Sequence, residues 1–116
     1  SWNYASKFDV IFSMESLYYS VPMEPALNKV FKMLKAGGLF YCGTDFYSDN
    51  HLTKRWTKVM KIPMDLRSKA EWKKMFREAG FKTTVRQVKD PKHRAKWKRE
   101  FGTLFVTGKK KTESRF

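Results

Sequence analysis

The apolar positions near the start of the chain follow first a strand pattern and then a helix pattern. Residues 8–12 (FDVIF) form a short, nearly unbroken apolar run, which is typical of a parallel strand covered on both faces. Farther along, apolar residues recur with the three- and four-residue spacing of one helical stripe. They are Leu27, Val30, Phe31 and Leu34. The pattern predicts a strand followed by an amphipathic helix.

Proline and glycine mark the two ends of this helix. Pro25 suits its first turn, where a missing N–H costs little. Gly37 lies where a left-handed C-terminal cap would fall. Residues 39–42 (LFYC) then resume as a second buried strand. Strand, helix and strand in this order form the right-handed crossover unit of a parallel sheet, so the sequence predicts an α/β fold.

A second long helix is predicted in the middle of the chain. Ser68 and Glu71 have the spacing of a capping box. An apolar stripe follows, and Gly80 caps its end. The stripe consists of Trp72, Met75, Phe76 and Ala79. A shorter helix is expected at residues 53–60, within a polar connection.

Two further strands are predicted after that helix. Residues 81–88 alternate between apolar and polar, as in a strand that is wet on one face. Residues 101–107 form another strand, after a basic stretch at residues 90–100. We expect the strand order first, second, fourth, third, with the last two strands antiparallel to each other.

Four segments resemble motifs of class I S-adenosylmethionine (SAM)-dependent methyltransferases, and they occur in the family's order. Residues 8–13 (FDVIFS) are similar to the fourth strand of that family, and residues 34–40 (LKAGGLF) to the turn into its fifth strand. Residues 72–81 (WKKMFREAGF) resemble the helix before the sixth strand, and residues 102–109 (GTLFVTGK) the seventh strand. The resemblance implies a Rossmann-like fold and methyl transfer from SAM.

The motifs with which this family holds most of its cofactor are missing from the sequence. The family binds SAM mainly through a glycine-rich turn after its first strand and an acidic residue at the end of its second. The sequence contains no G-x-G, and Ala36 stands where the family usually has proline. We therefore expect residues 1–116 to be the C-terminal half of a methyltransferase domain, a truncated fragment that is inactive by itself.

The resemblance places the chemistry at the carboxyl ends of the first two strands. Ser13, Met14 and Glu15 would border the methionine portion of SAM. Glu15 or Asp45 would deprotonate or orient a small-molecule acceptor. Four aromatic residues would face that acceptor: Tyr18, Tyr19, Tyr47 and Trp56.

Several of these residues also have a purely structural alternative. Glu15 could be a solvated loop acid, and Asp45 could form a turn. Because Tyr18 and Tyr19 are adjacent, only one of them is expected to face a pocket, while the other packs in the core. Trp56 could likewise be a core residue.

The composition adds a large and unevenly placed positive charge. The net charge is +14, and residues 47–116 carry the whole excess. Such a charge raises encounter rates with polyanions. Two alternative functions follow. The chain could be a nucleic-acid-binding module, in which the cations among residues 92–99 surround Trp97. It could also be the basic, non-catalytic subunit of a split methyltransferase.

The remaining expectations concern surroundings and partners. Cys42 is the single cysteine, which favours a core position and a cytoplasmic location. No segment is apolar enough for a membrane span, and His51 and His93 lack neighbours at metal-ligand spacing. The strand from Phe8 to Phe12 would have one bare edge, so we expect it to pair with a second copy or with the missing N-terminal half.

Overall fold

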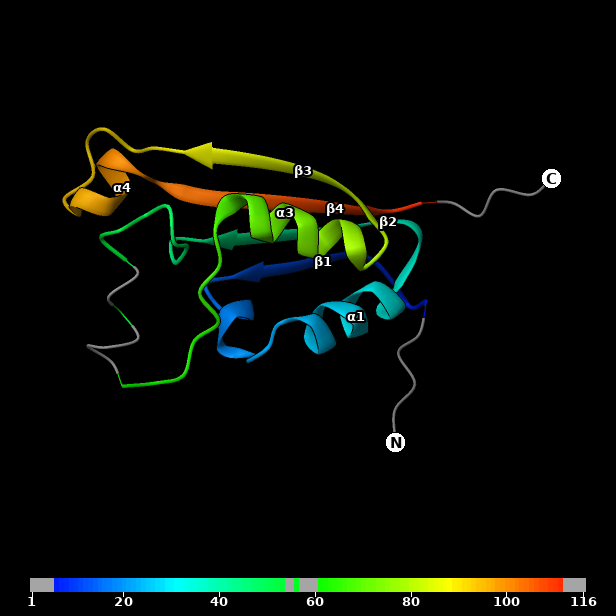
Figure 1. Ribbon diagram of the computed structural model, residues 1–116. Helices are drawn as coiled ribbons and strands as arrows, with labels where there is room; N and C mark the ends of the chain where they lie inside the picture. Colours follow the sequence, from blue (N-terminus) through cyan, green and yellow to red (C-terminus); the bar gives the residue numbers. More distant parts are fainter. Residues whose placement is uncertain (1–5, 54–55, 57–60, 112–116) are drawn as a thin grey trace.

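The structure, a computed structural model, describes residues 6–53, 56 and 61–111. It contains the strands β1 (Phe8–Met14), β2 (Leu34–Thr44), β3 (Phe81–Val88) and β4 (Thr103–Lys110). They form one mixed sheet in the order β1-β2-β4-β3 (Figure 1). β1 and β2 are parallel, whereas β4 is antiparallel to both of its neighbours. The α/β fold, the strand order and the strand directions are confirmed.

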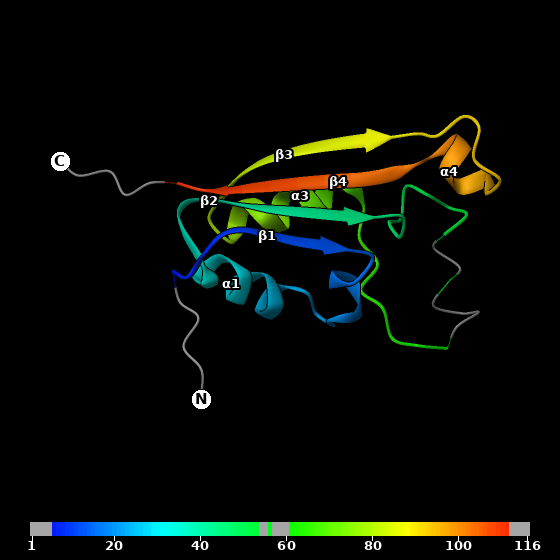
Figure 2. The same cartoon turned by 180° about the vertical axis from the view of Figure 1, so that it is seen from behind.

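Two helices, α1 (Glu24–Met33) and α3 (Lys69–Glu78), cover one face of the sheet (Figures 1 and 2). The predicted capping box begins α3. Ser68 Oγ accepts a hydrogen bond from the Glu71 N–H at 3.1 Å, and Glu71 Oε1 accepts one from the Ser68 N–H at 3.0 Å. These two bonds satisfy N–H groups that have no partner inside the helix.

The end of α1 differs from the sequence prediction. Leu34 belongs to the apolar stripe, but its backbone is already extended and it opens β2. Gly37 has the expected positive φ, 82°, yet it lies inside β2. The register with β1 shifts there, because Phe8 pairs with Leu34 while Val10 pairs with Leu39. Gly37 therefore accommodates an irregular stretch of strand and does not cap the helix.

Two short helices lie toward the carboxyl ends of the parallel strands: the 3-10 turn η1 (Leu17–Tyr19) and α4 (Lys96–Glu100). Figure 1 shows α4 in the connection between β3 and β4, close to the loop that follows β2. The helix expected at residues 53–60 falls largely on positions that the structure does not describe. Within the described segments, no helix combines the length and the hydropathy of a membrane span.

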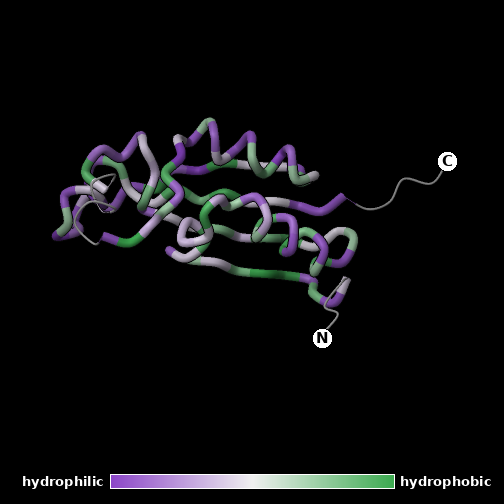
Figure 3. The backbone as a smooth tube through the Cα atoms, turned by 60° about the horizontal axis from the view of Figure 1, so that its bottom comes forward, coloured by the Kyte–Doolittle hydropathy of each residue, from purple (hydrophilic) through white to green (hydrophobic). Residues whose placement is uncertain are grey.

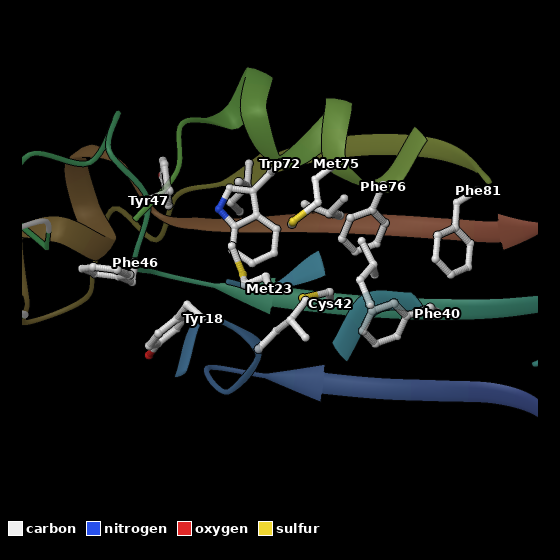
Figure 4. Packing of buried hydrophobic residues seen from close by; sticks show 14 of the residues in the cluster. Tyr18, Met23, Phe40, Cys42, Phe46, Tyr47, Trp72, Met75, Phe76 and Phe81 are labelled. Atoms are coloured by element: carbon white, nitrogen blue, oxygen red, sulfur yellow. The ribbon is translucent and has the colours of Figure 1, made fainter. Parts of the chain in front are cut away.

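The core lies between the helices and the sheet (Figure 4). Trp72 and Phe76 of α3 point toward β2, and Phe76 stacks on Phe40 with 5.6 Å between the ring centroids. Cys42 is buried, as the sequence predicts. Burial raises the pKa of its thiol to about 12, so the group stays protonated and behaves as a small apolar side chain.

The opposite face of the sheet is open, and here the sequence prediction was wrong. Residues 8–12 were expected to be covered on both faces, but Phe12 is 65% and Val10 54% exposed. Figure 2 shows the strands from this side, with α3 behind β2 and β4 and α1 below β1 in the view. Figure 3 shows the strand near the N-terminus as hydrophobic over much of its length. None of the described residues forms a layer over this face.

Candidate functional site

Two carboxylates follow the parallel strands at the same end of the sheet. Glu15 comes directly after β1, and Asp45 directly after β2. Met14 pairs with Gly43, so the strand ends are side by side. Glu15 has a positive φ of 54°, and its N–H donates to the Gly43 carbonyl at 2.9 Å. This turn brings the Glu15 side chain toward the end of β2, as the parallel arrangement predicts.

The Glu15 carboxylate is held by two neutral donors. The Tyr18 hydroxyl donates to Glu15 Oε2 at 2.9 Å, and the Asp45 N–H donates to Glu15 Oε1. Burial and the nearby Asp45 charge raise the pKa of Glu15, although these hydrogen bonds oppose the shift. A carboxylate with a raised pKa is a stronger proton acceptor, so the arrangement suits a general base.

Of the two adjacent tyrosines, one is buried and the other exposed, as expected. Tyr18 packs in the core and is tilted against Phe46, with 5.0 Å between the ring centroids. Tyr19 is exposed beside it, 4.8 Å from the Tyr18 ring. Burial, followed by the Glu15 carboxylate, raises the pKa of Tyr18, so this hydroxyl remains a donor to Glu15. Tyr19 is therefore the more accessible ring of the two, and the contact of either tyrosine with an acceptor stays a prediction.

Asp45 has very different partners, because a cation binds it directly. Its carboxylate accepts from Lys98 Nζ at 2.9 Å (Oδ1) and 2.8 Å (Oδ2), and from Thr103 Oγ1 at 2.6 Å. Lys98 Nζ also donates to Thr103 Oγ1 at 2.6 Å. The Asp45 carbonyl accepts from Thr53 Oγ1 at 2.7 Å and from Asn50 Nδ2 at 3.2 Å. Asp45 therefore fastens α4 and its own loop to the end of β2.

Ser13 and Met14 lie on opposite faces of β1, as successive strand residues must. Ser13 Oγ is 2.7 Å from Ser16 Oγ. Met14 packs against Gly43 on the open face, where a Cβ on Gly43 would lie 2.7 Å from Met14 Sδ. The structure therefore does not gather Ser13, Met14 and Glu15 into one contiguous set of side chains. Their contact with the cofactor stays a prediction.

Tyr47 and Trp56 lie outside the group of residues that hydrogen-bond to the Glu15 carboxylate. Tyr47 is fully buried, and its hydroxyl lies 2.9 Å from the Phe101 carbonyl oxygen and 3.0 Å from that of Gly102. Trp56 stacks on Phe46 with 6.1 Å between the ring centroids. Trp56 connects through Phe46 to Tyr18 and so borders the site, whereas Tyr47 ties the loop after β2 to the start of β4.

Sequence reasoning missed three residues of this region: Lys98, Thr103 and Trp97. Lys98 is one of several cations in the basic stretch, and the five-residue helix α4 is too short to show which side faces inward. Trp97 meets the Trp56 ring edge to face at 5.6 Å. The local sequence contains no signal for either contact.

The chemistry of these residues fits only part of SAM. A carboxylate such as Glu15 can accept from the ammonium group of the methionine portion. The sequence contains no G-x-G pattern, with which a glycine-rich turn would hold the rest of the cofactor. Among the described residues, no three His, Cys, Asp or Glu side chains are grouped to hold a metal ion.

No protein-family model matches the sequence, and no curated protein matches it. Several solved structures are similar to this chain. One of them belongs to the complex between the Haloferax volcanii Trm112 methyltransferase activator and a methyltransferase. It is 26% identical with a TM-score of 0.84, over 92% of this chain and 56% of that chain. A SAM-dependent methyltransferase from Thermotoga maritima is 19% identical with a TM-score of 0.71, over 92% and 58%. The [4+2]-cyclase SpnF is 16% identical with a TM-score of 0.70, over 94% and 52%.

The chain thus has the Rossmann-like fold of class I SAM-dependent methyltransferases, and the predicted resemblance is confirmed. It spans 56% of the Haloferax volcanii chain and 58% of the Thermotoga maritima chain. Because SpnF has this fold and is described as a cyclase, the activity has to be argued from the residues of the site.

Proposed function

We propose that this chain is the acceptor-side half of a SAM-dependent methyltransferase, completed by a cofactor-binding half that this sequence does not contain. The observation that carries the proposal is the position of Glu15. Its carboxylate lies where two parallel strands end, is held by Tyr18 and the Asp45 N–H, and has a raised pKa. Ligands of open α/β sheets bind at this edge.

In this proposal each residue of the site has a separate role in methyl transfer. Bound SAM would supply a methyl group on a sulfonium, and its transfer by direct displacement depends mainly on alignment. Glu15 borders the methionine portion of SAM and orients the acceptor, whose proton it takes, while Tyr18 fixes the carboxylate. Exposed Tyr19 lies against a small-molecule acceptor, and Trp56 closes the site from the side of Phe46. Asp45 positions α4, because Lys98 and Thr103 occupy its carboxylate.

The edge of β1 is where the cofactor-binding half would join. β1 ends the sheet, so among the described strands it has a neighbour on one side only. A free edge in the parallel part of a sheet can accept another strand. We infer that the other half pairs here in the complete protein, whereas a second copy of the chain would take its place when that half is lacking. The single buried thiol agrees with a cytoplasmic setting.

The nucleic-acid alternative is less well supported. Trp97 packs on Trp56 and Lys98 pairs with Asp45, so these two members of the basic stretch are engaged. Arg99 Nη1 donates to the carbonyls of His93 and Arg94, at 2.8 and 2.6 Å. Part of the stretch therefore organises its own loop, and base stacking on Trp97 would require Trp56 to move.

A chimera tests the proposal. It joins the part of the Haloferax volcanii methyltransferase outside the structural match to this chain, and SAM binding is measured by calorimetry. We expect the 116-residue chain alone not to bind and the chimera to bind. Glu15→Gln in the chimera should weaken binding about tenfold or more, the loss expected for one charge-assisted hydrogen bond.

The matched control is Glu78→Gln, because Glu78 is an exposed carboxylate on α3. This variant should leave SAM affinity unchanged. Micromolar binding by the chain alone would contradict the proposal. So would a folded chimera that binds SAM equally well with Glu15 and with Gln at that position.

A further inference from the structure

The strand β3 forms the edge of the sheet that lies farthest from β1. In the order β1-β2-β4-β3 it has a neighbouring strand, β4, on one side only. Figure 1 shows it as the uppermost strand of the sheet. Its side chains are alternately exposed and half-buried from Lys82 to Val88. The free side of such a strand presents backbone N–H and C=O groups with which another strand can pair.

Cations of α3 lie alongside this edge. Lys69 Nζ donates to Gln87 Oε1 at 2.9 Å, near the end of β3. Arg77 lines a hollow together with residues 80–83, at the start of β3. Lys73 is four residues from each of these cations, so the three form one row on the helix surface. The row therefore follows β3 along most of its length.

The strand itself adds cations on its other face. Phe81 and Val85 pack in or against the core, so Lys82 and Arg86, which are offset from them by odd numbers of residues, point to the open face. The hollow at the start of β3 has a volume of about 660 Å³, and Lys82 and Lys111 line it as well. The edge of β3 thus has cations beside both faces of the sheet.

This edge lacks anions that would balance its charge. Five of its cations have no ion pair within the described part of the chain: Lys69, Lys73, Arg77, Lys82 and Arg86. The strand β3 contains no acidic residue. The acids of α3, Glu71 and Glu78, line a different hollow, together with Glu24 of α1. The cations beside β3 are therefore available to an acidic partner.

We propose that the edge of β3 binds an extended acidic segment of a partner protein, which joins the sheet as an additional strand. Backbone hydrogen bonds to an edge strand supply affinity, and alternate side chains supply specificity. Successive side chains of the added strand point to opposite faces. Acids on one face would meet Lys82 and Arg86, and acids on the other would meet the row of cations on α3. An acid near one end of the segment would enter the hollow.

The same charges make a second copy of the chain a poor partner. Lysines on an edge strand normally prevent edge-to-edge pairing. Two copies joined through β3 would bring together two sets of Lys82 and Arg86, and like charges across an interface suppress association. An acidic segment reverses the sign of this interaction. The charge of the edge thus selects the partner.

Single-stranded nucleic acid, the other extended polyanion, fits the edge less well. Such strands are bound by exposed aromatic side chains on which the bases stack. The aromatic residues of α3 and β3 are Trp72, Phe76 and Phe81, and all three are buried. The edge therefore offers cations and strand backbone but no ring for a base.

Three labelled peptides with the length of β3, eight residues, test the proposal. The first carries glutamates on both faces of the strand, and the second has Gln in their place. The third keeps the glutamates but is N-methylated throughout, so it has no N–H groups. Binding to the 116-residue chain is followed by fluorescence anisotropy. We expect the Glu peptide to bind at least about tenfold more tightly than the Gln peptide, as several exposed ion pairs together would require.

The N-methylated peptide separates strand pairing from simple attraction between charges. It should bind at least about tenfold more weakly than the unmodified Glu peptide, because it cannot donate backbone hydrogen bonds. The unmodified Glu peptide should also slow amide hydrogen exchange in residues 81–88. Equal affinities of the two Glu peptides would overturn the proposal.

A charge-matched pair of triple variants locates the site. Replacing Arg77, Lys82 and Arg86 by Gln should abolish the preference for the Glu peptide. The control replaces by Gln three exposed cations that do not line this edge: Lys29, Lys32 and Lys74. It should preserve the preference. Equal losses in both variants would overturn the proposal, because net charge alone would then explain binding.

Other binding modes give distinct results. Binding that the first triple variant leaves unchanged would assign the peptide to the free edge of β1. Tight binding of single-stranded RNA that this variant abolishes, with no preference between the two Glu peptides, would assign the edge to a nucleic acid. Slower exchange in residues 81–88 when the chain alone is concentrated would assign it to a second copy. Each of these results overturns the proposal.

Discussion

Glu15 and Asp45 are carboxylates at equivalent ends of neighbouring strands, and their contacts give them different chemistry. The direct partners of Glu15 are neutral, whereas Asp45 is bound by the Lys98 ammonium. A cation stabilises the charged form of a carboxylate and fixes its geometry. Glu15, whose pKa is raised, suits a proton acceptor, whereas Asp45 serves as an anchor for Lys98 and Thr103.

The raised pKa of Glu15 predicts a particular dependence of stability on pH. The folded state binds this proton more tightly than the unfolded state, whose pKa is near 4.5. The free energy of unfolding should therefore fall as the pH rises from that value through the higher folded pKa, and change no further above it. In Glu15→Gln this decrease should be absent.

Urea unfolding of both proteins across this pH range measures the difference, since the contributions of the other carboxyl groups cancel. The direction of the change identifies its cause. If the fold stabilised the charged form of the carboxylate, the protein would become less stable as the pH falls. Parallel curves for the two proteins would show that Glu15 titrates in the folded state as it does in the unfolded chain.

Sequence reasoning located these two acids but not their roles. The parallel strand pair was predicted from local patterns, and it places Glu15 and Asp45 together without further information. The contact that separates them, Asp45 with Lys98, joins residues 53 positions apart. Nothing in the basic stretch distinguishes Lys98 from the cations around it, so its role depends on tertiary packing.

Among the secondary-structure elements, α4 depends strongly on two side-chain contacts. It has five residues, no buried side chain and no side-chain cap. Isolated helices of this length are unstable in water. Its attachment to the sheet rests largely on Lys98 and on the packing of Trp97 against Trp56.

Lys98→Met should therefore destabilise the protein by about 2 kcal/mol. Removing one partner of a buried pair costs roughly 3–5 kcal/mol, and the effect is smaller here because the Lys98 side chain is 27% exposed. Lys96→Met is the control on the same helix. Its pair with Glu100 is exposed on both sides and should contribute less than about 0.5 kcal/mol.

Circular dichroism during urea unfolding measures both variants. In the double variant Lys98→Met with Asp45→Asn, part of the loss should be recovered, because the buried carboxylate that lacks a cation is then removed. Equal effects of the two lysine substitutions would show that α4 does not depend on Asp45.

Elements defined by local signals agree best with their sequence predictions. The start of α3 is fixed by Ser68 and Glu71 alone, and the alternation of residues 81–88 defines β3 without distant contacts. The start of β2 was not predicted because Leu34 fits both the helical stripe and the strand. Its assignment depends on pairing with Phe8, which a local pattern cannot contain.

For the whole molecule, the dominant feature is a large positive net charge that is concentrated in one part of a small protein. The net charge of +14 belongs to residues 47–116, and the protein measures 49 × 30 × 20 Å. The Debye length is about 30 Å at 0.01 M salt and about 8 Å at 0.15 M. At low salt, repulsion therefore extends across most of the protein, and at the higher salt it is confined to neighbouring side chains.

Raising sodium chloride from about 0.01 M to about 0.15 M should increase the melting temperature. A rise of roughly 4 °C corresponds to about 1 kcal/mol of relieved repulsion for a domain near this size. Differential scanning calorimetry measures it. The variant with Gln at positions 29, 32 and 74 carries three fewer positive charges and should show a smaller rise. A melting temperature that falls with salt would mean that ion pairs such as Lys98–Asp45 outweigh the repulsion.

The position of β4 governs when the chain can fold during its synthesis. β4 follows the other three strands in the sequence, yet it lies between β2 and β3. Near its end, Lys110 Nζ donates to the carbonyls of Phe31 and Leu34, both at 2.9 Å, where α1 finishes. On the ribosome, β3 has no neighbouring strand until residues 103–110 have left the exit tunnel. The native sheet is therefore completed only then. Nascent chains that end before this point expose the unpaired edges of β2 and β3, which chaperones can bind.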